Sequence, residues 1–356
     1  MRGEVNPQAM MFSYFSPESK VPTDHPLRTL KLYADKVLKG MSREFDELYA
    51  ATGRPSIPPE PLLKGELLIA LYSVRSDRLF CEMLEYNLLF RWFLDMNLEE
   101  PGLDQSNFSR LRARLVETEL ARRFFEAVVR EARCRGLLSS EHFTVDGTLV
   151  EAWASHKSFR PKDPPRGGGT SGDFKGEIRR NDTHASTTDP EAKLLRKAAG
   201  KEAKLCFGAH ALMENRHGLC VELQVHSALV PEPAAAKQLL ARQARKHIHP
   251  DTLGGDKGYH TRAFVQYLRK KGIRPHIACI PTRTTPGLDR RTIRHPSYTV
   301  SQRKRKRIEE IFGWMKHYGG LRKTRFRGLA RVSMHAYWVA SAYNLLRLSR
   351  LAPLTG

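Results

Sequence analysis

The sequence predicts an α/β protein in which a mixed sheet with helices on its faces follows an all-helical region. Two observations carry this prediction. Residues 28–135 place apolar side chains almost throughout at helical spacing. From residue 141 onward the order becomes strand, hairpin, helix, strand, helix, strand, helix, which is typical of a mixed sheet covered by helices.

The helical region contains recognisable starts and stops. One helix begins at the prolines of "PPEPLLKGELLIALYSV" (58–74), because proline is tolerated in a first turn. Ser76 and Asp77 are suited to cap a single following helix over 79–96, which the Pro101–Gly102 pair ends. "DQSNFSRLRARL" (104–115) then begins another helix. We therefore expect a helical N-terminal domain, residues 1–138, that binds DNA.

The second domain is expected over residues 139–356. A β-type run from Phe143 to Val145 begins it, and Gly218 is suited to the turn of the hairpin over 205–227. The remaining expected elements are a helix (231–247), a strand (252–256), a helix (261–272), a buried strand (273–280), a basic helix from about Ser301, and a closing helix (335–351). Residues 160–190 are rich in Pro, Gly, Ser, Thr and charge, and predict a long mobile loop.

The charge balance indicates a polyanionic partner. The chain has 356 residues with 60 Lys and Arg against 38 Asp and Glu, a formal net charge of +22. Residues 301–350 hold 13 Lys and Arg against only two acids, Glu309 and Glu310, so half of the surplus lies there. Such an excess most often serves nucleic acid, here double-stranded DNA.

Cysteine and apolar patterns exclude several other classes. The five cysteines are scattered without a CxxC pair, which favours reduced thiols over a disulfide framework. His247 and His249 lack a matching pair, so a zinc site is not expected. The apolar run at 334–346 is too short to cross a membrane. We expect a soluble cytoplasmic protein without membrane contact.

Three acidic residues stand where they could serve one site. Asp146 and Asp256 each end a predicted strand and are followed closely by glycine, and Glu309 lies on the basic helix. Asp256 could also simply make a turn among its glycines. Together, however, three carboxylates suit Mg²⁺ or Mn²⁺, and two such ions support phosphodiester chemistry.

Longer stretches carry a resemblance to a known family. They are "FTVDGTLVEAWASHKSF", "STTDPEAKLLRKAAGKEAKL", "GAHALMENRHGL", "GGDKGYHTRAFV" and "RIEEIFGWMKHYGGLRKTRFRG", in this order, with a similar helical N-terminal segment at 56–94. The chain resembles, from about residue 20 onward, the bacterial insertion-sequence transposases of the DDE type, in the insertion-sequence-five group with a Y-x2-R-x3-E-x6-K signature.

The resemblance implies a ribonuclease H-like core with Asp146, Asp256 and Glu309 as catalytic and metal-binding residues for two Mg²⁺ or Mn²⁺ ions. It implies a DNA transposase that binds terminal inverted repeats, cleaves them and transfers strands to target DNA. Such an enzyme would be a dimer in its DNA complex and associated with the nucleoid. A catalytically inactive DNA-binding derivative and a metal-dependent nuclease that only hydrolyses are the alternatives.

The chain departs from the family pattern at two positions. Arg305, Glu309 and Lys316 fill the R-x3-E-x6-K frame, but the tyrosine position holds Gln302. His260 stands where the family usually has an acidic residue. Neither departure changes one of the three acids.

DNA contacts are expected from two segments. Arg303, Lys304, Arg305, Lys306 and Lys316 would hold the DNA backbone beside the site. Arg110, with Ser106 and Asn107, could reach base edges from a recognition helix, although Phe108, Leu111 and Leu115 also fit a helix packed on a core, and both can hold at once.

Other polar and aromatic residues keep two interpretations. His210 and Asn215 fall in a family-like stretch, and hydrogen bonding within the hairpin would explain them equally well. Trp153 and Trp314 could stack on bases, with core packing the favoured interpretation for Trp153.

The helical period chooses between the adjacent acids Glu309 and Glu310. Residues advance about 100° each around a helix, which puts Ile308, Ile311, Phe312 and Met315 on one apolar face. Glu309 then borders that face, whereas Glu310 points away from it. We expect Glu309 to be the metal ligand.

Overall fold

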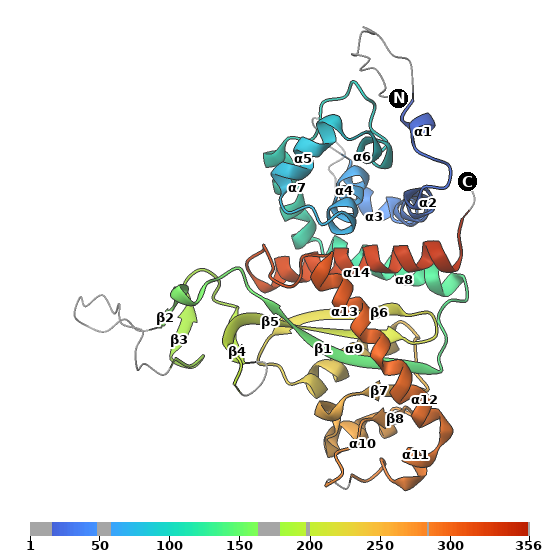
Figure 1. Ribbon diagram of the computed structural model, residues 1–356, viewed down its shortest axis with the longest axis vertical. Coiled ribbons are helices and arrows are strands. Elements are labelled where there is room, and N and C mark those ends of the chain that lie inside the picture. Colours follow the sequence, from blue (N-terminus) through green and yellow to red (C-terminus); the bar gives the residue numbers. More distant parts are fainter. Residues whose placement is uncertain (1–15, 48–57, 163–178, 197–199, 283–284, 355–356) are drawn as a thin grey trace, which may run out of the picture.

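The computed structural model describes residues 16–47, 58–162, 179–196, 200–282 and 285–354. An assembly of helices and a mixed sheet follow each other along the longest axis of the molecule. The long C-terminal helix α14 (Leu329–Leu351) runs between them (Figure 1). The expectation of a helical region followed by a mixed sheet with flanking helices is confirmed.

Helices follow one another through the N-terminal part. They are α1 (Pro17–Lys20), α2 (Pro26–Lys39), α3 (Ser42–Asp46), α4 (Pro59–Leu71), α5 (Asp77–Tyr86), α6 (Leu88–Phe93), α7 (Gln105–Glu117) and α8 (Leu120–Cys134). Ser76 caps α5 as predicted, because its hydroxyl accepts a hydrogen bond from the Leu79 amide at 3.1 Å. The single helix predicted over 79–96 is wrong: Asn87 has extended backbone and its side chain caps α6, which separates α5 from α6.

The sheet has six strands, five of which form an order of three antiparallel strands followed by two parallel ones. Strand β5 (Ala203–Glu214) lies between β6 (Leu219–Ser227) and β1 (His142–Glu151) and is antiparallel to both. β7 (Thr252–Gly255) is parallel to β1, and β8 (Arg274–Ile277) is parallel to β7. The order β6-β5-β1-β7-β8 with these directions is a ribonuclease H-like sheet, as expected. Gly218, with φ +72°, makes the predicted hairpin turn.

The structure has more strand than the sequence predicts. β1 continues to Glu151, because residues as far as Glu151 remain paired with β5, so Asp146 lies within a strand and not at its end. β4 (Lys193–Arg196), which pairs with β5, was not expected. β2 (Phe159–Pro161) pairs with β3 (His184–Ser186), partly inside the segment predicted as a long loop. Residues 163–178 of that loop lie outside the described residues.

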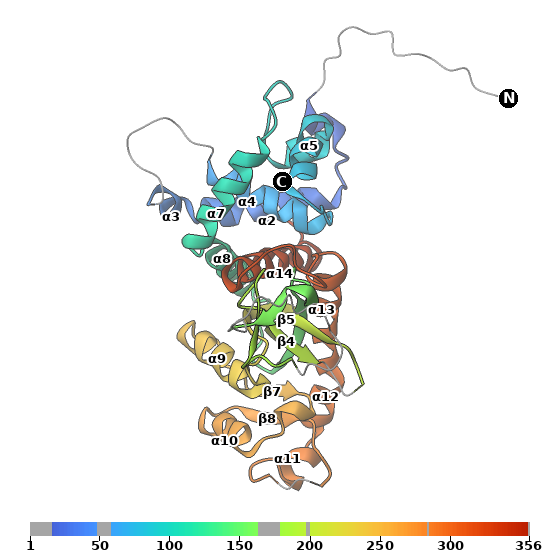
Figure 2. The same ribbon diagram turned by 90° about the vertical axis from the view of Figure 1, so that its left-hand side faces the viewer.

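Helices cover both faces of the sheet. α9 (Glu232–Arg245) and α10 (Arg262–Lys270) lie on one side, and α12 (Pro296–Lys304) and α13 (Ile308–His317) on the other (Figure 2). The short α11 (Arg290–Arg294) precedes α12. The basic helix expected from Ser301 is two helices, since a 3-10 turn at Arg305–Arg307 interrupts it.

α14 joins the two halves of the molecule. It contacts α2, α4, α7 and α8 on the helical side and β6 on the sheet side. Its buried side chains include Val332, Trp338 and Leu345. The boundary predicted after residue 138 falls between α8 and β1, but the helices before it share a core with α14. Within the described residues, none of the helices is both long and apolar enough to cross a membrane.

Candidate active site

The sheet register places Asp146 and Asp256 beside each other. The parallel pairing of β1 and β7 ends at Thr144 opposite Gly254, and each aspartate lies two residues beyond its paired residue. Because side chains alternate along a strand, equal offsets on neighbouring parallel strands point to the same face. α13 contacts β1 and carries Glu309 at its second position, so three separate elements supply the three acids.

The charges of Asp256 and Glu309 both reach Asp146. The pKa of Asp146 is raised to about 6, first by burial and then by the negative charges of Asp256 and Glu309. A hydrogen bond from the Gly147 amide at 2.8 Å and the positive charge of Arg305 oppose the shift without cancelling it. The carboxylate of Asp256 also caps its turn by accepting from the Gly258 amide at 2.8 Å.

A fourth acid, Glu232, lies at the same place and was missed by the sequence patterns. It is the first residue of α9, and its pKa is raised to about 7 by burial and by the charges of Asp256 and Asp146. The available signal was an acid directly after Pro231, at the start of a helix that covers the sheet. The pattern alone favours an ordinary acidic first turn.

The donor chemistry of these acids fits a hard divalent cation. They offer only carboxylate oxygens, and their mutual repulsion would be relieved by a cation. As the side chains stand, the structure gathers no three His, Cys, Asp or Glu residues closely enough to hold a metal ion within the described part of the chain.

At two glycines of "LGGDKGYH" the absence of a side chain leaves room for a neighbouring group. A Cβ at Gly254 would meet the Thr144 hydroxyl at 3.3 Å and the Arg305 Cβ at 3.4 Å. A Cβ at Gly258 would lie 2.7 Å from Glu232 Oε2 and 3.0 Å from Asp256 Oδ1. These glycines therefore allow the basic turn and two carboxylates to approach the end of β7.

His210 and Asn215 have structural roles on either side of β1. The His210 ring lies over Gly147, whose absent Cβ would be 2.7 Å from it. The side-chain amide of Asn215 donates to the Thr144 hydroxyl at 2.7 Å, and the backbone carbonyl of Asn215 accepts from Arg307 at 2.6 Å. Hydrogen bonding around the hairpin thus explains Asn215, and packing explains His210.

The faces of α13 separate Glu309 from Glu310. Ile308, Ile311, Phe312 and Met315 are all buried, so the predicted apolar face is confirmed. The charge of Glu309 acts on Asp146, whereas that of Glu310 acts on Tyr343. Glu310 lies beside Trp314, which packs against the rings of Tyr318 and Tyr343 at about 6 Å between centroids.

The side chain of Arg305 is held by Gln302. Its Nε donates to Gln302 Oε1 at 3.1 Å, and Gln302 in turn donates to the His276 carbonyl. Lys316 is half-buried on α13, while Arg303, Lys304 and Lys306 are exposed. Among these basic residues, Arg305 is the one whose charge acts on Asp146.

His260 has a structural partner in place of an acidic role. The side chain is buried, and its Nδ1 accepts a hydrogen bond from the Ile280 amide at 2.9 Å. This bond ties the segment after Asp256 to the segment after β8. An acid at this position could accept the same bond.

Helix α7, which was predicted to read DNA, has the buried apolar face and the exposed polar face expected from the sequence. Phe108 and Leu111 are buried, whereas Ser106 and Arg110 are exposed. Arg110 donates to the Asn107 side chain at 2.6 Å. Leu115 has a side chain outside the described part. The core position favoured for Trp153 is wrong: this side chain is 50% exposed just beyond the end of β1.

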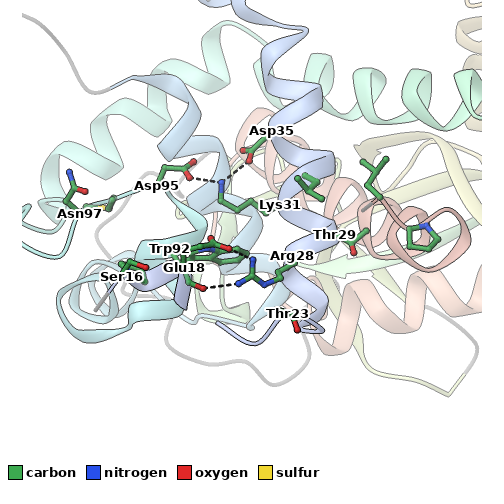
Figure 3. Close-up of a pocket in the computed structure, with 15 residues that line it drawn as sticks. Ser16, Glu18, Thr23, Arg28, Thr29, Lys31, Asp35, Trp92, Asp95 and Asn97 are labelled. Atoms are coloured by element: carbon green, nitrogen blue, oxygen red, sulfur yellow. Dashed lines mark hydrogen bonds and ion pairs between the residues drawn. The ribbon is translucent and has the colours of Figure 1, made fainter. Parts of the chain in front are cut away.

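A cavity in the N-terminal helical part lies apart from these acids. About 930 Å³ in volume, it is enclosed by α1, α2 and the segment around α6 (Figure 3). Its charged lining is already paired: Arg28 with Glu18, and Lys31 with Asp35 and Asp95. We assign it to the packing of the N-terminal helices.

Comparisons with known proteins agree with this architecture. A family described as "Transposase domain (DUF772)" matches residues 15–114, and one described as "Transposase DDE domain" matches residues 140–345. No curated protein matches the chain.

Among solved structures, a piggyBac transposase synaptic complex with hairpin DNA is 11% identical. It covers 95% of this chain and 78% of its own, with a TM-score of 0.42. The Mos1 strand transfer complex is 12% identical over 84% and 78% of the two chains, with a TM-score of 0.27. These structural overlaps are partial, so the assignment of the chain to a family rests on the family match. Since that match spans more than half of the sequence, the chain belongs to the DDE transposases.

Proposed function

We propose that this transposase cleaves the terminal inverted repeats of an insertion sequence and joins the freed ends to target DNA at Asp146, Asp256 and Glu309. The observation that supports the assignment is the parallel register of β1 and β7, which gives Asp146 and Asp256 equal offsets, together with the contact of α13 with β1. The charges of Asp256 and Glu309 both contribute to the raised pKa of Asp146. The frame of Arg305, Glu309 and Lys316 supports membership of the insertion-sequence-five group, with Gln302 as its departure.

DDE transposase domains generally use divalent metal ions, and the three carboxylates are suited to hold them. Two Mg²⁺ or Mn²⁺ ions would activate water or a 3′-hydroxyl and stabilise the leaving oxygen. The protein's own contribution is to keep the carboxylates ionised and close together. Arg305 serves this purpose, because its positive charge lowers the pKa of Asp146 against burial.

DNA would approach from the side of α12. The exposed Arg303, Lys304 and Lys306 offer phosphate contacts next to the acids, and such contacts position DNA without reading sequence. The exposed side of α7 would read the repeats. Joining two ends requires both to be held together, which supports a dimer in the DNA complex, working at the nucleoid.

The test is an incubation of purified full-length protein with DNA carrying the flanking ends, with Mg²⁺, Mn²⁺ or EDTA. We expect cleavage at the ends and strand-transfer products with either metal and none with EDTA. Cleavage without joining would identify a nuclease that only hydrolyses. Binding without cleavage under all conditions would identify an inactive derivative, and both results would overturn the proposal.

A further inference from the structure

We propose that Glu232 is a fourth carboxylate of the metal site and holds a divalent cation together with Asp256 and Asp146. The inference rests on the function proposed above and adds a residue from a fourth element, α9. The strand-end and signature patterns that select the other acids do not select this one.

The geometry at Gly258 places Glu232 against Asp256. A Cβ on Gly258 would be 2.7 Å from Glu232 Oε2 and 3.0 Å from Asp256 Oδ1, so both oxygens border the same small space. α9 contacts the 3-10 turn Lys257–Tyr259 that follows Asp256. The two oxygens therefore converge from two elements on a position that only glycine leaves open.

No other partner accounts for the position of Glu232. Within the described residues, the structure gives its side chain no hydrogen bond and no ion pair, although the chain contains 60 Lys and Arg. An acid in a first helical turn is favourable in general. That preference is satisfied equally by a side chain turned to solvent, and it does not explain an approach to another carboxylate.

Tyr259 gives a second, independent indication that a cation binds among these acids. Its side chain is fully buried, and its hydroxyl has no hydrogen-bond partner among the described residues. Tyr259 belongs to the 3-10 turn that follows Asp256 and contacts α9, and the charges of Glu232, Asp146 and Asp256 add to burial in raising its pKa. A buried hydroxyl without a hydrogen-bond partner is unfavourable. A hydrated cation among the acids would supply the missing polar contact.

The test measures metal binding rather than activity. Full-length protein without DNA is titrated with Mn²⁺, and free Mn²⁺ is followed by its paramagnetic resonance signal. We expect Glu232→Gln to weaken Mn²⁺ binding at least tenfold. Glu310→Gln removes the same charge on the outer side of α13 and should remain within twofold of the parent.

Parent-like Mn²⁺ binding by Glu232→Gln would overturn this inference. If Glu232→Gln does not fold, Mn²⁺ binding is measured for Glu232→Ala, with the same expected results. This variant is suitable because the position is half-buried and the truncation leaves no buried charge unpaired. Asp146→Asn and Asp256→Asn separate the two proposals. Lost binding in these two with retained binding in the Glu232 variants rejects only the role of Glu232. Retained binding in all of them rejects the metal site itself.

Discussion

Gly147 and His210 illustrate how single residues position the acids. They are paired across β1 and β5, and the imidazole occupies the space that a Cβ on Gly147 would need. Asp146 is the preceding residue, so any shift of β1 at this point would move its carboxylate. Sequence could identify the glycine beside the aspartate, but the residue that requires it lies 63 positions away.

We predict that Gly147→Ala lowers cleavage at least tenfold and lowers the unfolding temperature, since an overpacked site costs about 1–3 kcal/mol. Adding His210→Ala should restore part of both losses, because it removes the ring that the new methyl meets. Gly313→Ala is the matched control, since a Cβ there meets nothing within 4 Å. Full activity of the Gly147 variant would show that β1 absorbs the methyl without moving Asp146.

At the scale of elements, the 3-10 turn between α12 and α13 sets the positions of the basic side chains proposed to contact DNA. It holds Arg305 over Gly254 while Arg303 and Lys304 remain exposed at the end of α12. The sequence predicted a continuous basic helix, because basic residues at 303–307 suit a helix and a 3-10 turn equally. The apolar face of α13 was nevertheless predicted correctly, since its buried residues all follow the turn.

Replacing Arg303, Lys304 and Lys306 by Gln should weaken binding to all DNA sequences alike. The slope of log K against log salt should become shallower by up to about 3, because each lost phosphate contact removes roughly 0.9. Fluorescence anisotropy across a salt series measures both quantities. An unchanged slope would mean that these side chains face only solvent in the complex.

α7 should carry part of the sequence recognition. We predict that Arg110→Gln reduces the preference for terminal repeats over scrambled duplex by roughly tenfold to a hundredfold, as a lost base contact costs about 1–3 kcal/mol. Arg130→Gln, an equally exposed arginine on α8, is the control. The test uses the full chain in a competition gel shift, because the helices before residue 138 share their core with α14. An unaltered preference would move recognition to another element.

At the scale of the whole molecule, α14 makes the helical part and the sheet one packed unit. The sequence predicted the closing helix and the order of the five main strands with the helices between them. It could not predict that the last helix lies between them, since a helix that is apolar on all sides indicates burial but not its neighbours. For the same reason Asp146, Asp256 and Glu309 could be selected from local patterns, whereas Glu232 and Tyr259 became visible only through contacts in space.

Burial of His335 in α14 gives a stability prediction. Burial, Arg325 and Arg112 lower its pKa to about 3. A histidine with a lowered folded pKa stabilises the fold above its unfolded value of about 6.5, and this contribution is lost as pH falls from there toward 3. At pH 5 the loss is roughly 2 kcal/mol.

His335→Gln should therefore reduce the drop in unfolding temperature between pH 7.5 and pH 5.0. The exposed His249→Gln variant should show the same drop as the parent. Differential scanning calorimetry of metal-free protein gives the comparison. An equal drop in the His335 variant would place the acid sensitivity in other groups.

The cleavage rate of variants in the proposed acids tests the central claim most directly. Purified Asp146→Asn, Asp256→Asn and Glu309→Gln should bind the element ends like the parent and give no Mg²⁺-dependent cleavage, because each loses one ligand charge with little change in volume. Glu310→Gln should cleave at nearly the parent rate. Cleavage by any of the first three at more than a few per cent of the parent rate, or an inactive Glu310 variant beside an active Glu309 variant, would contradict the site described here.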